Sequence, residues 1–379
     1  MTVLNVLHVC TDFFPSIGGI QSFVLELAKR SSEVGIRAAI LCCDRVRGCP
    51  GNLPPVDEVN GIPVRRVPFL DLHFYKPTFF RPSLVRGYDL VHVHGIGAQL
   101  DYLSMTKSLH RTPILVSTHG GIFHTPALQR VKQAYFRAIQ PMVMANVDLV
   151  AACSRSDAKL FSSVSKRVHL VDNAVDVEPY LALRMQHKVD GRCLYVGRLA
   201  DNKGIESLLK VFAVAKARGA EFLLRLVGPD PLEQTAHYRA IAATLKIGAC
   251  VEFVGMVDPS QLLAEYEQAA YFVSASRYEG FGISAIEAMA AGCCLILQNN
   301  DAFESLFSSD ADVKLMNFEE IDSAGAYLAE RLKSGPRGAG ASGRSRAGIY
   351  SWERKILEWS SIYARVAERQ TPSGSRLPA

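Results

Sequence analysis

Short apolar segments of strand length alternate with longer amphipathic segments along almost the whole chain. In the first half such strand-like segments run from Val3 to Ala152, and in the second half from Cys193 to Gln298. This alternation predicts parallel sheets covered by helices, because consecutive parallel strands need a crossover connection that is usually helical. The expected fold class is therefore α/β, with two halves of similar architecture and no sequence repeat between them.

Length and composition limit the class of protein. The chain has 379 residues, of which 49% are hydrophobic, enough for two domains that each bury a core. No apolar run approaches the roughly 18–20 residues of a membrane-spanning helix, and the N-terminus lacks signal-peptide features. The nine cysteines show no C-x-x-C spacing and are interpreted as reduced thiols. We expect a cytoplasmic globular protein with no metal ion and no cofactor.

The net charge of +5 lies entirely in the first half of the chain. Residues 1–180 contain 19 Lys and Arg against 14 Asp and Glu, whereas residues 181–379 contain 23 of each class. This excess is too small and too scattered for a nucleic-acid surface. It favours an anionic partner such as a phospholipid surface or a lipid diphosphate, with ordinary surface charge as the alternative.

The most specific pattern lies in residues 278–292. Glu279 and Glu287 stand eight positions apart, and a glycine-rich turn between them opens a predicted helix. Such a turn directs backbone N–H groups toward phosphate or sugar oxygens at the helix N-terminus. Two acids at a fixed spacing also occur by chance, so the spacing alone is equally compatible with one exposed loop acid and one helix acid.

A second pattern places two cations after a predicted strand that ends in glycine. Arg198 follows Gly197, and Lys203 lies five positions later. A guanidinium group binds phosphate oxygens bidentately, and a lysine supplies a mobile point charge, so the pair suits a diphosphate. Solvated surface cations are the alternative.

Two features of the first half follow predicted strands. Gly18 and Gly19 stand between a strand and a helix, where their backbone can approach a ligand; a tight turn that needs positive φ is the alternative. His119 follows another strand and is expected at the carboxyl edge of the sheet. His92 and His94 alternate as metal ligands do, but no third ligand is evident, so we interpret them as core and cleft-edge residues.

Together these motifs resemble the retaining glycosyltransferases of family 4, which have the GT-B fold. Residues 278–292 resemble the E-x7-E element of that family, and residues 197–204 its Gly-Arg-Leu-x-x-x-Lys-Gly pattern. The string from Ser117 to Thr125 is similar to mannosyltransferases that build bacterial exopolysaccharide repeat units on lipid carriers. The sequence departs from the family at residues 299–304, where a glycine-containing loop is typical.

The resemblance implies two Rossmann-like domains whose parallel sheets face a central cleft. Residues 1–175 would form the acceptor domain and residues 176–350 the nucleotide-sugar domain. A helix over residues 351–366 would cross back to the first domain, and residues 367–379 would form a disordered tail.

The resemblance also implies roles for the motif residues without a metal ion. Arg198 and Lys203 would stabilise the leaving nucleoside diphosphate, Glu287 would bind the ribose, and His119 would lie against the transferred sugar. Asp310-Ala311-Asp312 matches the Asp-x-Asp pattern of metal-dependent transferases but follows two polar serines, and is interpreted as a solvated loop. The remaining substrate contacts are assigned to Glu279 with the backbone of Gly280, Phe281, Gly282 and Ile283, and to Gly18 and Gly19 beside the donor.

The expected substrates are GDP-mannose as donor and a polyprenyl-diphosphate-linked saccharide as acceptor. Residues 65–86 mix cations with aromatic side chains, which suits contact with the inner face of a membrane, although burial of the rings is equally compatible with the pattern. The alternatives are a UDP-sugar donor with another glycan acceptor, or a non-catalytic nucleotide-sugar-binding protein. A nicotinamide-dependent oxidoreductase is disfavoured because the first strand is not followed by Gly-x-Gly-x-x-Gly.

Overall fold

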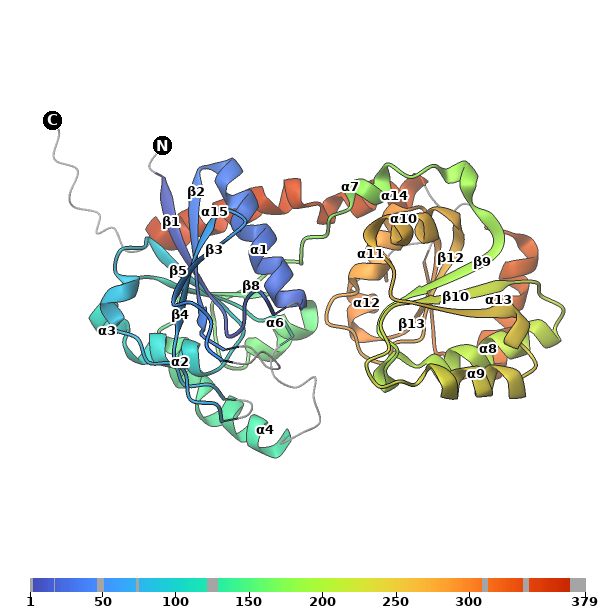
Figure 1. The fold of residues 1–379 in the computed structure, drawn as a ribbon, viewed down its shortest axis with the longest axis horizontal. Helices are drawn as coiled ribbons and strands as arrows, with labels where there is room; N and C mark the ends of the chain where they lie inside the picture. The colour runs from blue at the N-terminus through green and yellow to red at the C-terminus, as the bar shows by residue number, and fades with distance from the viewer. Residues whose placement is uncertain are drawn as a thin grey trace. The chain divides into compact units, whose positions relative to one another are not determined.

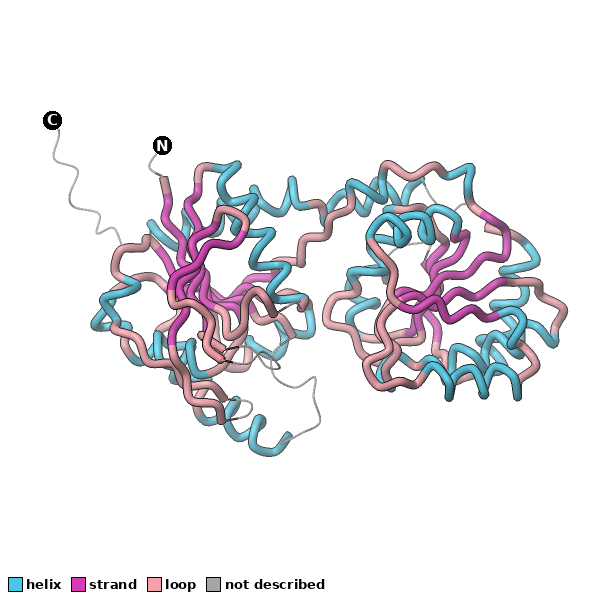
Figure 2. The backbone as a smooth tube through the Cα atoms, viewed as in Figure 1, coloured by secondary structure: helices cyan, strands magenta, loops and turns pink. Residues whose placement is uncertain are grey.

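The chain forms two compact units, each built around its own parallel sheet. The structure is a computed structural model that describes residues 3–16, 18–45, 51–72, 75–120, 129–308, 313–336 and 341–368. The first unit contains the described residues up to Asn173 together with those from Glu353 onward, and the second unit is Ala174–Trp352. Figures 1 and 2 show a sheet with helices on both faces in each unit.

The sheet of the first unit has eight strands in the order β3-β4-β2-β1-β5-β6-β7-β8, and only β3 runs antiparallel to its neighbour. The strands are β1 (Leu4–Val9), β2 (Ile36–Cys43), β3 (Val56–Val59), β4 (Ile62–Val67), β5 (Leu90–His94), β6 (Ile114–Ser117), β7 (Leu149–Ala152) and β8 (Val168–Leu170). The helices are α1 (Gly19–Ser31), α2 (Ala98–Met105), α3 (Lys107–His110), α4 (Gln129–Ala138), α5 (Gln140–Ala145), α6 (Arg155–Phe161) and α15 (Trp352–Glu368).

The sheet of the second unit has six parallel strands in the order β11-β10-β9-β12-β13-β14. The strands are β9 (Val189–Val196), β10 (Leu223–Val227), β11 (Val251–Gly255), β12 (Ala269–Ser274), β13 (Cys294–Gln298) and β14 (Val313–Met316). The helices are α7 (Glu178–Leu181), α8 (Ile205–Ala217), α9 (Thr235–Thr244), α10 (Pro259–Gln268), α11 (Ile283–Ala290), α12 (Asp301–Phe307), α13 (Ile321–Ser334) and α14 (Ala341–Ala347).

Both faces of the second sheet are buried, which explains its nearly continuous apolar strands. Successive side chains of a strand point to opposite faces, so neighbouring residues enter different cores. Tyr195 and Tyr271 pack on the face that also buries Phe212 of α8, whereas Leu194 and Phe272 pack on the face that buries α11. The apolar strands therefore bury side chains against a helical layer on each face of the sheet.

The hairpin of β3 and β4 and the last strand β14 were not among the predicted strands. β4 alternates buried residues such as Val64 with exposed ones such as Arg65. Its arginines interrupt the apolar run by which the other strands were predicted. The described helices include none that is long and apolar enough to cross a membrane.

Parallel pairing places the carboxyl ends of the central strands at one edge of each sheet. In the first unit Val9 of β1 pairs with Val93 of β5, and His94 pairs with Ser117 of β6. In the second unit β9 and β12 are neighbours, with Leu194 opposite Phe272. The loops that leave these strand ends carry the motifs found in the sequence, as expected for parallel α/β sheets.

A close backbone contact seats the loop after β9. Gly204 has φ +64°, and a Cβ atom there would lie 2.3 Å from the carbonyl oxygen of Ala275, just after β12. Only glycine fits this approach. Two residues earlier in that loop, the backbone carbonyl of Asn202 accepts a hydrogen bond from the amide of Arg277 at 2.9 Å. The two loops are thus joined through their backbones.

Gly204→Ala should destabilise the second unit by about 2–4 kcal/mol, because the left-handed backbone and the clash with Ala275 act together. Urea denaturation measures the loss. The control is Gly219→Ala, since Gly219 also has positive φ, but its Cβ would meet only the flexible end of Lys333 at 3.8 Å. We expect about 1–2 kcal/mol there. Equal losses in the two variants would contradict the role of the close contact.

Candidate active site

Lys203 and Glu279 form an ion pair at the carboxyl edge of the second sheet. Lys203 ends the short 3-10 turn Asp201–Lys203 after β9, and Glu279 lies in the loop between β12 and α11. The lysine Nζ lies 2.7 Å from Oε1 of Glu279, and the two side chains are only 13% and 16% exposed. Partial burial strengthens the interaction of these charges with any group that enters the site. A ligand that contacts one of these groups is therefore within reach of the other.

Arg198 lies on the same edge, two residues beyond the end of β9. Its backbone carbonyl accepts a hydrogen bond from the Tyr195 hydroxyl at 3.0 Å, which holds the main chain while the side chain is exposed. Within the part of the chain that the structure describes, no carboxylate pairs with this guanidinium group. Its binding to a diphosphate stays a prediction.

The glycine-rich turn before α11 leaves its backbone accessible. Gly282 has φ +91° and directly precedes α11, and a Cβ there would come within 2.7 Å of the Phe303 ring. Gly280 is exposed, with open space where a Cβ would stand, and Ile283 is 45% exposed. The side chain of Phe281 is buried, with its ring edge-on to Tyr350, so only its backbone can reach a ligand. The first turn of α11 thus presents free amide groups.

Glu287 lies in the second turn of α11 and is held by tyrosines that sequence reasoning did not find. The Tyr266 hydroxyl donates to Oε2 of Glu287 at 2.8 Å, and Tyr180 hydrogen-bonds to the same carboxylate. The pKa of Glu287 lies above its usual value, because the effect of burial is larger than the opposing effect of these hydrogen bonds. A carboxylate has about four acceptor sites, so it retains capacity for the hydroxyls of a ribose.

Gly18 and Gly19 do not form the tight turn considered as the alternative. Gly18 is extended, with φ −172°, and Gly19 is the first residue of α1. A Cβ at Gly19 would meet nothing within 4 Å, and one at Gly18 would meet only the flexible end of Gln21. Neither backbone conformation requires glycine, and the two residues leave open space beside the main chain; their contact with a donor stays a prediction.

His119 stands at the carboxyl end of β6 in a left-handed conformation, with φ +47°. Asp157 of α6 holds both neighbours in place, because its carboxylate accepts from the Thr118 hydroxyl and, at 2.9 Å, from the Gly120 amide. The ring Nε2 lies 3.1 Å from Nδ1 of His94, and Nδ1 lies 3.8 Å from the Cys153 sulfur. A sugar hydroxyl would compete with this weakly bonding thiol for Nδ1. Gly121, His124 and Thr125 of the same string lie outside the described residues, as does Asp310-Ala311-Asp312.

Three buried histidines lie beside His119, and the expectation that His92 and His94 lack a third partner was wrong. His8 of β1 joins them, and ligand atoms of the three rings lie within 4.8 Å of one another, close enough for a metal ion. His94 bonds to His8 at 3.0 Å. Both nitrogens of His92 are occupied, by the Tyr363 hydroxyl of α15 at 2.8 Å and by Ser117 at 2.7 Å.

The arrangement of these rings favours a hydrogen-bonded core over a metal site. His92 and His94 lie with ring centroids 4.0 Å apart and their planes tilted by only 36°, so their lone pairs, which lie in the ring planes, do not converge on one point. A metal ion would also have to displace the hydrogen bonds that His92 and His94 already make. Burial lowers the pKa of His119 to about 4 and that of His8 to about 3, so the cluster is neutral at pH 7.

Comparison with known families covers both units. A family model of glycosyltransferase family 4 matches residues 17–179, and a model of glycosyl transferases group 1 matches residues 187–339. A GDP-mannose:cellobiosyl-diphosphopolyprenol alpha-mannosyltransferase from Komagataeibacter xylinus is 33% identical over 99% of this chain and 97% of its own. The chain belongs to the family 4 glycosyltransferases. A protein of the same name from Xanthomonas campestris is also 33% identical, over 85% of both chains.

Solved structures confirm the fold expected of this glycosyltransferase. A sucrose-phosphate synthase from Thermosynechococcus elongatus superposes with a TM-score of 0.72 over 97% of this chain and all of its own, at 20% identity. The lipopolysaccharide outer core galactosyltransferase WaaB gives a TM-score of 0.73 over 96% of this chain and all of its own, at 14% identity. The enzyme has the GT-B fold of two Rossmann-like domains.

The buried histidines of this glycosyltransferase should make it acid-sensitive. Because their pKa values are lowered in the fold, their contribution to stability is complete above the unfolded pKa of about 6.5 and is lost as the pH falls toward 4. Protonation of one such group changes the free energy of unfolding by up to about 1.4 kcal/mol per pH unit. His8→Gln should therefore flatten the dependence of unfolding free energy on pH, as measured by urea denaturation followed by tryptophan fluorescence.

The control for this prediction is His169→Gln, since His169 is exposed on β8. It should leave the dependence on pH unchanged. An equally steep loss of stability in wild type and His8→Gln between pH 6.5 and 4 would contradict the assignment of a neutral buried cluster.

Proposed function

We propose that this enzyme transfers mannose from GDP-mannose to a lipid-linked saccharide, with retention of configuration, in polysaccharide biosynthesis. The observation that carries the proposal is the 33% identity, over nearly the full length of both chains, to a mannosyltransferase whose name specifies GDP-mannose and cellobiosyl-diphosphopolyprenol. Because the proposed acceptor is lipid-linked, the proposal includes work at the cytoplasmic face of a membrane as a peripheral protein. A UDP-sugar donor is the alternative, since more distant relatives have other names, such as a glycogen synthase that is 23% identical over 79% of this chain.

The geometry of the second unit supports binding of the donor at the carboxyl edge of its sheet. Arg198, Lys203 and the first turn of α11 would neutralise the diphosphate as it leaves, because positive groups there are oriented before reaction begins. Glu279, held beside Lys203, would accept hydrogen bonds from sugar hydroxyls. Glu287, held by Tyr266, would do the same for the ribose.

The reaction then needs no protein nucleophile. The bond between the anomeric carbon and the diphosphate oxygen breaks, and the acceptor oxygen bonds to the same face of that carbon. The proton of the acceptor hydroxyl passes to an oxygen of the departing diphosphate. The contribution of the chain is to hold this diphosphate and stabilise its charge.

Transfer itself tests the proposal. The enzyme is incubated with a synthetic cellobiosyl-diphosphoryl lipid and with GDP-mannose, UDP-glucose or UDP-galactose, and nucleotide release and labelled lipid product are measured. We expect GDP release coupled to mannose incorporation only when both substrates are present. Turnover of a UDP-sugar alone would establish the alternative donor, and binding without release of any nucleotide would indicate a non-catalytic protein.

Lys203→Ala should lower kcat by roughly 100- to 1,000-fold, because it removes a cation that acts on charge developing in the transition state. Lys210→Ala is the matched control: Lys210 lies on α8 and makes only an exposed pair with Glu206 at 2.7 Å. That variant should retain wild-type turnover. If Lys203→Ala folds normally and also retains turnover, the lysine has no role in the reaction.

Glu287→Gln should act on donor affinity more than on rate. The amide keeps an acceptor for Tyr266 but loses the charge that strengthens hydrogen bonds to ribose hydroxyls, so we expect KM for the donor to rise roughly 10- to 100-fold. Steady-state kinetics with varied GDP-mannose give the result. A fall in kcat at unchanged KM would show that Glu287 acts on the reacting centre instead.

A further inference from the structure

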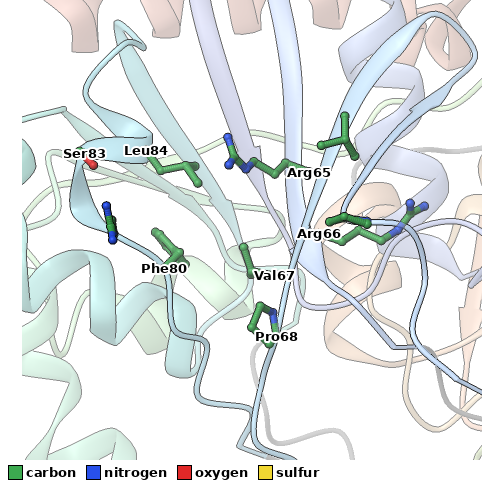
Figure 3. A pocket seen from close by; sticks show the side chains of 10 residues that line it. Arg65, Arg66, Val67, Pro68, Phe80, Ser83 and Leu84 are labelled. Carbon is green, nitrogen blue, oxygen red and sulfur yellow. The ribbon is translucent and has the colours of Figure 1, made fainter.

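A pocket of about 440 Å³ lies in the first unit, between β4 and the segment that leads into the 3-10 turn Pro82–Val85. Figure 3 shows Arg65 and Val67 on one wall, and Phe80 and Leu84 on the other. Val67 ends β4 opposite Cys43 of β2, and this strand end lies at the same edge of the sheet as the ends of β1 and β5. The pocket therefore flanks the edge that carries Gly18, Gly19 and His119.

The charges around this pocket are cationic and largely unpaired. Alternation along β4 sends neighbouring arginines to opposite faces, and Figure 3 shows their guanidinium groups pointing apart. The side chain of Arg66 is 2% exposed and is neutralised by Asp57 at 2.7 Å. Arg65 and Arg81 are exposed, and neither has a carboxylate partner among the described residues. The described lining of the pocket contains no acidic side chain.

Apolar side chains form part of the pocket wall and lie beside it. Val67, Phe80 and Leu84 form much of its lining, and Val56 at its edge is 72% exposed. Phe79, next to the pocket residue Phe80, is 67% exposed. Large apolar side chains left exposed beside a pair of cations are typical of a surface that binds an amphiphile.

We propose that this pocket binds the diphosphate of the lipid-linked acceptor, with its first isoprenoid units against the apolar rim. This inference rests on the proposed function. A diphosphate esterified at both ends carries two negative charges, which the two unpaired arginines match, and each guanidinium group can bind one phosphate bidentately. A phospholipid phosphodiester carries one such charge, so a diphosphate uses the pair more completely.

Direct binding of farnesyl diphosphate, a soluble prenyl diphosphate, tests the proposal. The titration is done at saturating GDP, so that the donor site of the second unit is filled and cannot take the probe. Arg65→Gln and Arg81→Gln should each raise the Kd of the probe roughly tenfold or more, and the double variant should bind no probe. Arg37→Gln is the matched control, since Arg37 is an exposed arginine at the amino end of β2. It should bind as the wild type does.

Three results would overturn the proposal. The first is an unchanged Kd in the double variant, with folding verified by thermal melting. The second is equal affinity for inorganic diphosphate, which would leave the apolar rim without a role. The third is arginine-dependent binding to phosphatidylglycerol vesicles without binding of farnesyl diphosphate, which would make the pocket a bilayer contact. Arginine-dependent binding in an enzyme that transfers no mannose would uphold this site and reject only the proposed function.

Discussion

The contact between Gly204 and the backbone of Ala275 is the constraint on which the proposed donor site depends. It brings the loop after β9 against the loop after β12, and so seats Lys203 beside Glu279. A side chain at position 204 would separate the two loops, and the cation and the carboxylate would no longer share one edge of the sheet. The backbone contact thus positions the two loops, and the ion pair between Lys203 and Glu279 depends on that position.

The rest of the second unit supports the same edge. Gly282 lets α11 begin close to Phe303, which points the first turn of that helix outward, and Tyr266 holds Glu287 one turn further on. Asn300 caps α12 through the Phe303 amide and donates to the carbonyl of Ser276 at 2.8 Å. Asn300, in the segment 299–304 where the sequence departs from the family pattern, therefore supports the loop that carries Glu279.

Much of the fold and the membership of the family could be predicted from the sequence, because buried parallel strands produce apolar runs and glycine turns have recognisable spacing. The arginines of β4 concealed that strand, since a strand whose side chains alternate between buried and exposed lacks a continuous apolar run. His8 was not predicted beside His92 and His94, because the pairing of β1 with β5 joins residues 84 positions apart. The pairing of Lys203 with Glu279 likewise depends on which strands are neighbours, which the sequence does not specify. The substrate roles of these residues stay predictions.

We propose that Lys203 and Glu279 contact adjoining parts of one bound donor, the diphosphate and the sugar. The most direct measurement is a crystal structure of the enzyme with GDP-mannose. We expect Lys203 Nζ within hydrogen-bonding distance of a diphosphate oxygen and the Glu279 carboxylate within the same distance of a mannose hydroxyl. A donor bound with neither group in contact would contradict it.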